Sequence, residues 1–151
     1  MLKINPYLNF PGNAEEAFNF YKSVFGGEFA YLQRYKDVKD LPNADKFSES
    51  DKEKIMHISL PIGKENVLMA SDSIASMGHP IKIGDNFNLS ISTESEKEAD
   101  EIFGRLAAGG KVEMALEKTF WGAYFGMLQD KFGIWWMISY DYNLKTVVKE
   151  N

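Results

Sequence analysis

Residues 13–29 read NAEEAFNFYKSVFGGEF, and residues 95–112 read SEKEADEIFGRLAAGGKV. In both segments apolar side chains recur at steps of three and four residues, which is the spacing of one face of an α-helix. Asn13 and Ser95 stand at the N-cap position, each with a glutamate three residues later, and a Gly-Gly pair closes each segment. The chain therefore contains the same predicted helix twice, with the same start and stop signals.

Extended segments flank both predicted helices. NFNLSIS, residues 86–92, alternates apolar with polar side chains and predicts a half-buried strand. KINPYLNF, residues 3–10, is also strand-like, and Pro6 removes one backbone donor, which favours an edge strand or a bulge. Further candidate strands follow each Gly-Gly pair: EFAYLQRY, KIMHISLPI and ENVLMASD after the first, and VEMALEK, WGAYFGMLQ and GIWWMISY after the second.

The order of these elements repeats along the whole chain. Gly27 corresponds to Gly110 and Lys64 to Lys131, but the first copy is longer between these positions. The extra residues fall in the polar segment 36–53, which predicts a long loop. We therefore expect an α+β fold of two βαβββ modules in a single domain, with module 1 at about residues 1–73, a linker at about 74–84 and module 2 at about 85–142.

The composition excludes several classes of protein. The net charge of −5 and the scattered lysines argue against a nucleic-acid-binding protein, because phosphate contacts need clustered basic residues. The absence of cysteine excludes thiolate chemistry and suits a reducing compartment. No apolar run is long enough to span a membrane, and the Gly-Gly pairs end helices instead of preceding them as a phosphate-binding loop would. We expect a soluble, cytoplasmic protein without nucleic-acid or membrane partners.

Two stretches carry a family resemblance. The first is YLNFPGNAEEAFNFY, residues 7–21, which includes Asn9 and Gly12. The second is TFWGAYFGMLQDKFGIWWMIS, residues 119–139, in which the characteristic residues are Trp121, Gly122, Asp130, Phe132, Gly133 and Trp136. Together with the two βαβββ modules, they resemble the vicinal oxygen chelate (glyoxalase/bleomycin-resistance/dioxygenase) superfamily, and specifically its PhnB-like branch; Lys131 replaces a proline common in that branch. The resemblance covers essentially the whole chain and implies curled mixed sheets around a concave pocket, usually in a homodimer.

The resemblance also implies where a metal would bind. In metal-dependent relatives the first and last strands of each module each supply one ligand, commonly His or Glu. In this chain the implied positions are Pro6 or Tyr7, Met69 or Ala70, Asn88, and Met137, with the register of the first two strands open by one residue. Amide and thioether groups are poor ligands for hard or borderline divalent ions, so we expect neither a metal nor another cofactor.

Three titratable residues need an interpretation, and only for Asp72 do two remain open. We interpret His57, on a strand that supplies no implied ligand, as structural and His79 as an exposed turn residue. Asp72 lies two residues beyond Ala70 and therefore on the same face of its strand. Its carboxylate either faces the mouth of the cavity, as a ligand-binding group or weak candidate catalytic base, or caps a turn.

The aromatic residues of the second module divide between core and cavity, because alternate strand residues face opposite ways. Trp135 shares a face with Met137. The predicted ligand-binding residues are Asn9, Asp72, Asn88, Ser90, Trp135 and Met137, a set that favours an apolar or aromatic ligand.

Two functions remain open at this point. The first is a metal-free protein that binds a small apolar or aromatic molecule. The second is an enzyme, either a glyoxalase-type metal-dependent lyase, isomerase or dioxygenase, or a metal-free catalyst that uses Asp72.

Overall fold

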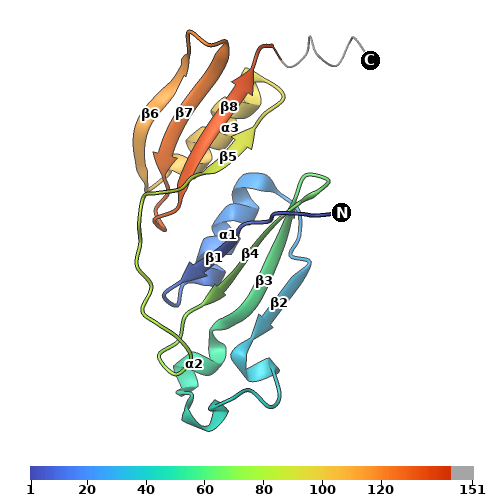
Figure 1. Ribbon diagram of the computed structural model, residues 1–151, viewed down its shortest axis with the longest axis vertical. Helices are drawn as coiled ribbons and strands as arrows, with labels where there is room; N and C mark the ends of the chain where they lie inside the picture. The colour runs from blue at the N-terminus through green and yellow to red at the C-terminus, as the bar shows by residue number, and fades with distance from the viewer. Residues whose placement is uncertain (144–151) are drawn as a thin grey trace. The chain divides into compact units, whose positions relative to one another are not determined.

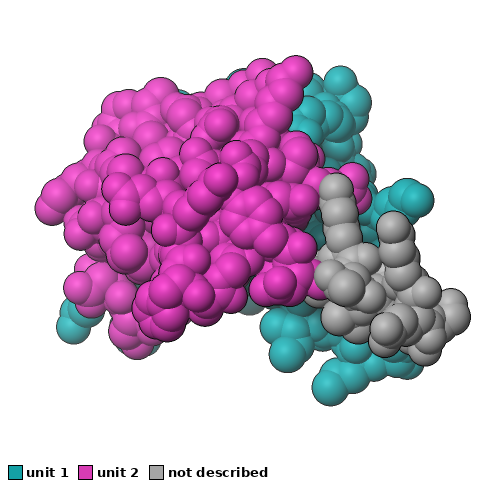
Figure 2. Space-filling view, turned by 90° about the horizontal axis from the view of Figure 1, so that it is seen from above, with its two compact units in different colours: residues 1–82 teal, residues 83–151 magenta. Residues whose placement is uncertain are grey.

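A computed structural model describes residues 1–143 of the chain. The chain divides into two compact units, Met1–Lys82 and Ile83–Asn151, which Figure 2 shows in different colours. The division falls inside the predicted linker. Within the described part, no helix combines the length and the apolar character that crossing a membrane requires.

Unit 1 follows the predicted order of one strand, one helix and three strands (Figure 1). Its main elements are β1 (Tyr7–Phe10), α1 (Ala14–Phe25), β2 (Tyr31–Arg34), β3 (Ile55–Ile62) and β4 (Asn66–Asp72). The strand order in the sheet is β1-β4-β3-β2. The edge strand β1 runs parallel to β4, and the other pairs are antiparallel.

Unit 2 repeats this arrangement. Its elements are β5 (Leu89–Ser92), α3 (Glu96–Ala107), β6 (Lys111–Lys118), β7 (Ala123–Gln129) and β8 (Trp135–Asp141). The strand order is β5-β8-β7-β6, and the edge strand β5 is again the parallel one. The predicted fold is therefore confirmed: two βαβββ modules form mixed four-stranded sheets of the α+β class.

The structure corrects three local predictions. The strands β1 and β5 are shorter than expected, since residues 3–6 and 86–88 lie outside them. The predicted loop 36–53 contains short helices, η2 (Ala44–Lys46) and α2 (Glu49–Glu53), and overlaps η1 (Tyr35–Asp37). These pieces are held by a small apolar cluster, because Tyr35, Phe47 and Ile74 bury one another beside Leu41 and Met56.

The third correction concerns the helix caps. Ser95 caps α3 as predicted, because its hydroxyl accepts a hydrogen bond from the Glu98 amide at 3.0 Å. The Glu98 carboxylate, however, accepts from the amide of Glu94 and not from that of Ser95. At α1 the Asn13 side chain makes no capping hydrogen bond, so the predicted cap is wrong there.

One face of each sheet packs against its helix. In unit 1 α1 packs against β3 and β4 (Figure 1), and the buried side chains of the sheet are Leu8, Phe10, Ile58, Leu60, Leu68 and Ala70. In unit 2 they are Leu128, Trp136 and Ile138, beneath Phe103 and Leu106 of α3. Successive strand residues point to opposite sides, so the neighbours of these residues project from the other side of the sheet. We call that side the open face of each unit.

The second Gly-Gly pair allows close approach of two backbone segments. A Cβ on Gly110 would lie 2.3 Å from the carbonyl oxygen of Gln129, which no side chain could tolerate without backbone movement. Gly104 lies within α3 and has open space around it, because a Cβ added there would meet nothing within 4 Å. A side chain at Gly110 would therefore clash with the backbone, whereas a side chain at Gly104 would not.

These two positions make a matched test of the packing. Gly110→Ala should destabilise the protein by about 1–3 kcal/mol, because the methyl group has no room. Gly104→Ala should stabilise it by about 0.5–1 kcal/mol, because alanine favours the helix. Urea unfolding followed by circular dichroism measures both changes. Equal effects in the two variants would contradict the close approach at Gly110.

Tyrosine hydroxyls tie α3 to the strands of unit 2. The Tyr124 hydroxyl donates to Asp100 at 2.7 Å, and the Tyr142 hydroxyl donates to Glu96. The pKa of Tyr142 is raised to about 12, mostly by loss of hydration and to a smaller extent by the hydrogen bond to Glu96. The neutral hydroxyl is therefore the form that the folded state favours.

This pKa shift predicts a pH dependence. Because the folded pKa is raised, the contribution of Tyr142 to stability is complete below the ordinary tyrosine pKa near 10 and is lost as the pH rises through about 12. In an ultraviolet titration, Glu96→Gln should make one tyrosine ionise at lower pH than in the wild type, whereas Glu101→Gln, on the same helix, should not. An unchanged titration in the first variant would contradict the assignment.

Candidate functional site

Strand pairing places defined rows of side chains on the open face of unit 1. Tyr7 pairs with Met69, Met69 with Ser59, and Ser59 with Tyr31. The register left open by the sequence is thereby resolved, since Tyr7 and Met69 project from the open face while Ala70 is buried on the helix side.

The adjacent row on this face is polar. Asn9 pairs with Ser71, and His57 pairs with Gln33. Asn9, one of the predicted ligand-binding residues, is exposed. Its side chain is therefore accessible to a molecule bound on this face.

The open face of unit 2 has a different character. One row is Ser90, Met137, Met127 and Met114, which pair in that order across all four strands. The next row contains Ser92, Ser139, Phe125 and Glu117. The ring of Trp121, 53% exposed, packs edge-on against that of Phe125 with centroids 5.9 Å apart. Thioethers and aromatic rings dominate this face.

Two predicted residues of unit 2 have unpartnered polar atoms. Trp135 pairs with Gln129 and shares the open face with Met137, and alternation places Asn88 on the same side as Ser90. The Asn88 Oδ1 and the Trp135 Nε1 are both buried, and neither has a hydrogen-bond partner among residues 1–143. A buried acceptor and a buried donor without partners cost free energy, which a bound polar group would recover.

Asp72 does not lie on the open face of unit 1, so the prediction that it binds ligand or acts as a base needs correction, and its role is the alternative one of a cap. Its side chain is on the same face as Ala70, as expected, but this is the helix-covered face, where Asp72 is 2% exposed. Oδ1 accepts from the amide of Ala14 at 2.9 Å, and Oδ2 accepts from the amide of Ile55 at 2.8 Å. Asp72 thus supplies the acceptor for the first amide of α1, that of Ala14.

This assignment predicts a stability effect. Asp72→Asn keeps the shape of the side chain but turns an NH₂ group toward one of the two amides, which leaves that buried donor unpaired. The variant should lose about 1–3 kcal/mol of unfolding free energy. Asp85→Asn, at an exposed position before β5, is the matched control and should change it by less than about 0.5 kcal/mol. Similar losses in both would refute a capping role for Asp72.

The characteristic D-K-F-G-I-W segment, residues 130–136, also has a structural role. Asp130 is buried, and its Oδ1 accepts from the amides of Phe132 and Ile134 at 2.8 and 3.1 Å. Its Oδ2 accepts from the indole nitrogen of Trp136 at 2.9 Å. Gly133 has φ +88°, a conformation that side chains rarely adopt. This segment therefore fixes the turn into β8 and holds Trp136 in the core.

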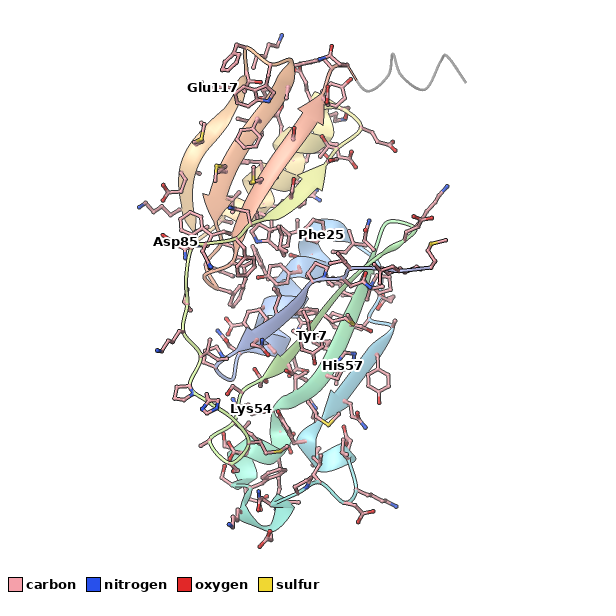
Figure 3. The ribbon with its side chains drawn as sticks, viewed as in Figure 1. Tyr7, Phe25, Lys54, His57, Asp85 and Glu117 are labelled. Atoms are coloured by element: carbon pink, nitrogen blue, oxygen red, sulfur yellow. The ribbon has the colours of Figure 1, made fainter. Side chains whose placement is uncertain are left out.

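His57, which the sequence analysis interprets as structural, lies on the open face of unit 1. Its ring lies between two tyrosines, and the Tyr7 hydroxyl is 3.1 Å from its Nδ1 (Figure 3). The signal was present in the sequence, because alternation with the buried residue Ile58 puts His57 on the opposite side of β3. His79 is exposed, and its backbone carbonyl accepts from the Ser73 hydroxyl.

The residues at the implied metal positions do not fit a divalent ion. The paired open-face residues of the edge and last strands are Tyr7 with Met69 and Ser90 with Met137. They offer a phenol, a hydroxyl and two thioethers, with the amide of Asn88 nearby in the sequence, whereas zinc and manganese sites use imidazoles and carboxylates. Among residues 1–143, no three His, Asp or Glu side chains form a group that could hold a metal.

Comparison with known proteins places the chain in a family. The family model described as 3-demethylubiquinone-9 3-methyltransferase matches residues 2–139. The chain belongs to this family. It is 32% identical over 146 residues to Protein YjdN of Escherichia coli (strain K12), covering 91% of this chain and 95% of YjdN.

Solved structures agree with this assignment. Protein PA1353 from Pseudomonas aeruginosa is 37% identical with a TM-score of 0.80, over 93% of this chain and 98% of that one. A putative 3-demethylubiquinone-9 3-methyltransferase, PhnB protein, from Bacillus cereus is 29% identical with a TM-score of 0.72, over 92% and 99% of the two chains. The fosfomycin resistance protein FosX from Listeria monocytogenes, complexed with Mn(II) and sulfate, shares the fold at 12% identity with a TM-score of 0.61. The predicted glyoxalase/bleomycin-resistance fold is confirmed, and membership of the PhnB-like branch is consistent with these relatives.

Proposed function

We propose that this protein binds a small apolar or aromatic molecule and that it does so without a metal ion. The observation that carries the proposal is the open face of unit 2, where Met114, Met127 and Met137 lie side by side on three adjacent strands. Unbranched thioether side chains adapt to ligands of different shape, and the rings of Phe125 and Trp121 extend the same surface. Such a surface suits an organic ligand better than a hydrated ion.

The unpartnered atoms of Asn88 and Trp135 refine the ligand class. The indole N–H of Trp135 needs an acceptor, and the amide oxygen of Asn88 needs a donor. The pairing of Leu89 with Trp136 makes Asn88 and Trp135 neighbours at the start of β5 and β8. A carboxamide carries both groups on one carbon, so we expect a ligand with an apolar body and a terminal amide. This expectation follows from the cost of leaving a buried polar atom unpaired.

The alternative is a glyoxalase-type metal-dependent lyase, isomerase or dioxygenase, and the observation in its favour is the shared fold with FosX. One fold supports many activities, so neither that likeness nor the family's description is evidence for a particular reaction. The phenol, the amide and the thioethers at the implied metal positions favour the binding function over this alternative.

The proposal also includes the oligomeric state, the compartment and the partners of the protein. A homodimer is what the family resemblance implies, and a reducing cytoplasm suits a chain without cysteine. The net charge of −5 argues against a nucleic-acid partner. Light scattering coupled to size-exclusion chromatography tests the dimer independently of any ligand.

Matched ligands test the binding function. The probes are 2-naphthamide with 2-acetylnaphthalene, and decanamide with 2-undecanone; in each pair the ketone keeps the carbonyl oxygen and lacks the N–H donors. Calorimetry should give tighter binding of one or both amides than of their ketones, by about tenfold. Asn88→Ala should remove this preference, because the acceptor for the N–H group is lost.

The control for this test is Asn86→Ala, an exposed asparagine two residues earlier. It should leave the preference for the amide unchanged. Trp135→Phe should weaken amide and ketone alike, because both probes offer an oxygen to the indole N–H. Absence of binding for all four probes to the folded wild type, or a preference unaffected by Asn88→Ala, would contradict the proposal.

A further inference from the structure

The open face of unit 1 carries an aromatic cluster of Tyr7, His57 and Tyr31, which the proposed function does not use. The rings of Tyr7 and His57 are stacked, with centroids 5.6 Å apart and an interplanar angle of 26°. The ring of Tyr31 lies 5.5 Å from that of His57 on its own strand, β2. We propose that this cluster is a second binding site, and that it takes planar aromatic carboxylates.

The aromatic part of the ligand is inferred from exposure. Tyr7 is 45% exposed and Tyr31 is 47% exposed, so both rings present surface to solvent on this face. Exposed tyrosines offer a large, rigid contact surface at little cost in conformational entropy, which is why they concentrate at binding sites. A flat aromatic ring can stack on these faces as His57 and Tyr7 already stack on each other.

The carboxylate is inferred from the hydrogen bond to His57. The Tyr7 hydroxyl lies 3.1 Å from Nδ1 of His57, and in the tautomer that accepts from this hydroxyl the neutral imidazole carries its proton on Nε2. Within residues 1–143 no hydrogen bond to Nε2 is present, so this nitrogen can donate to a ligand oxygen. An N–H donor that meets a carboxylate forms a charge-assisted hydrogen bond, which is stronger than one to a neutral oxygen.

The neighbouring positions do not oppose an anion. On β1 and β4 the open-face residues near His57 are Tyr7, Asn9, Met69 and Ser71. On β2 and on β3 itself they are Tyr31, Gln33 and Ser59. None of these side chains is a carboxylate, although the chain as a whole has a net charge of −5. The face is therefore a patch without side-chain carboxylates around His57, whose ring can donate a hydrogen bond to an anion.

The two faces thus predict different ligands. Unit 2 offers thioethers with an amide oxygen and an indole N–H, and unit 1 offers stacked rings with an imidazole donor. The two sites can be tested separately with 2-naphthoate and 2-naphthamide, which have the same shape and differ in charge. Failure of one proposal leaves the other intact, because each has its own probe and its own variants.

The test is calorimetric titration of the full-length protein with 2-naphthoate. The wild type should bind it, and His57→Phe, which keeps a ring and removes the donor, should weaken binding by about tenfold or more. Tyr7→Phe keeps the stacking ring and should give a smaller loss. His79→Phe is the matched histidine control, and Asn88→Ala is the control at the other site; both should leave naphthoate binding unchanged.

Ring signals in NMR add a signature that a merely structural His57 would not give. The chain has 2 histidines, and His79→Phe assigns their ring signals, so the wild type can be used even where His57→Phe does not fold. Added naphthoate should then shift the His57 signals and not those of His79.

Three outcomes would overturn this inference. The first is no binding of 2-naphthoate to the folded wild type. The second is equal affinity in His57→Phe and in the wild type, or equal shifts for both histidines. The third is an equal loss of 2-naphthamide binding in His57→Phe, which would mean that the substitution acts on the protein as a whole.

Discussion

The parallel pairing of each edge strand with the last strand of its unit determines which side chains this protein can offer to a ligand. β1 pairs with β4 and β5 pairs with β8, and in both sheets a single helix covers one face. A slip of one residue in either pair would exchange the buried and open sets of side chains. In unit 1 the register is reinforced by Asp72, whose carboxylate joins the end of β4 to the first residues of α1 and β3.

The two units keep the same backbone and differ in the chemistry of their open faces. The backbone is held in the same way in both units. A buried aspartate, Asp72 or Asp130, accepts hydrogen bonds from backbone amides at one end of a strand pair. The open faces have no such common constraint. Unit 1 carries tyrosine, histidine and small polar residues, and unit 2 carries a row of methionines beside aromatic rings. Duplication followed by divergence of the open faces explains both observations.

The fold could be predicted from the sequence because its signals are local and occur twice. Helical spacing, Gly-Gly ends and alternating strands each depend on a few neighbouring residues, and agreement between two copies strengthens every one of them. The cap of α1 could not be predicted in this way, since its acceptor is Asp72, 58 residues from Ala14. The short helices of segment 36–53 span only three to five residues, too few to show helical periodicity in the sequence, and the tertiary cluster of Tyr35, Phe47 and Ile74 packs beside them.

The candidate site was predicted in part. Alternation correctly paired Trp135 with Met137 and Asp72 with Ala70, but alternation along one strand does not say which face the helix will cover. For Asp72 the covered face was the one that sequence reasoning assigned to the cavity. His57 is interpreted as structural from the sequence because its strand supplies no implied metal ligand. In the structure its ring lies beside those of Tyr7 and Tyr31. Contacts between strands, which the sequence alone does not give, decide both cases.

The central claim is that the open faces present organic side chains suited to organic ligands and not to divalent ions. The most direct measurement is the metal content of protein purified without chelators, combined with calorimetric titration by Mn²⁺ and Zn²⁺. We predict no stoichiometric metal in the purified protein and no saturable binding of either ion. A stoichiometric ion that is lost on substitution of Tyr7 or Asn88 would contradict the account.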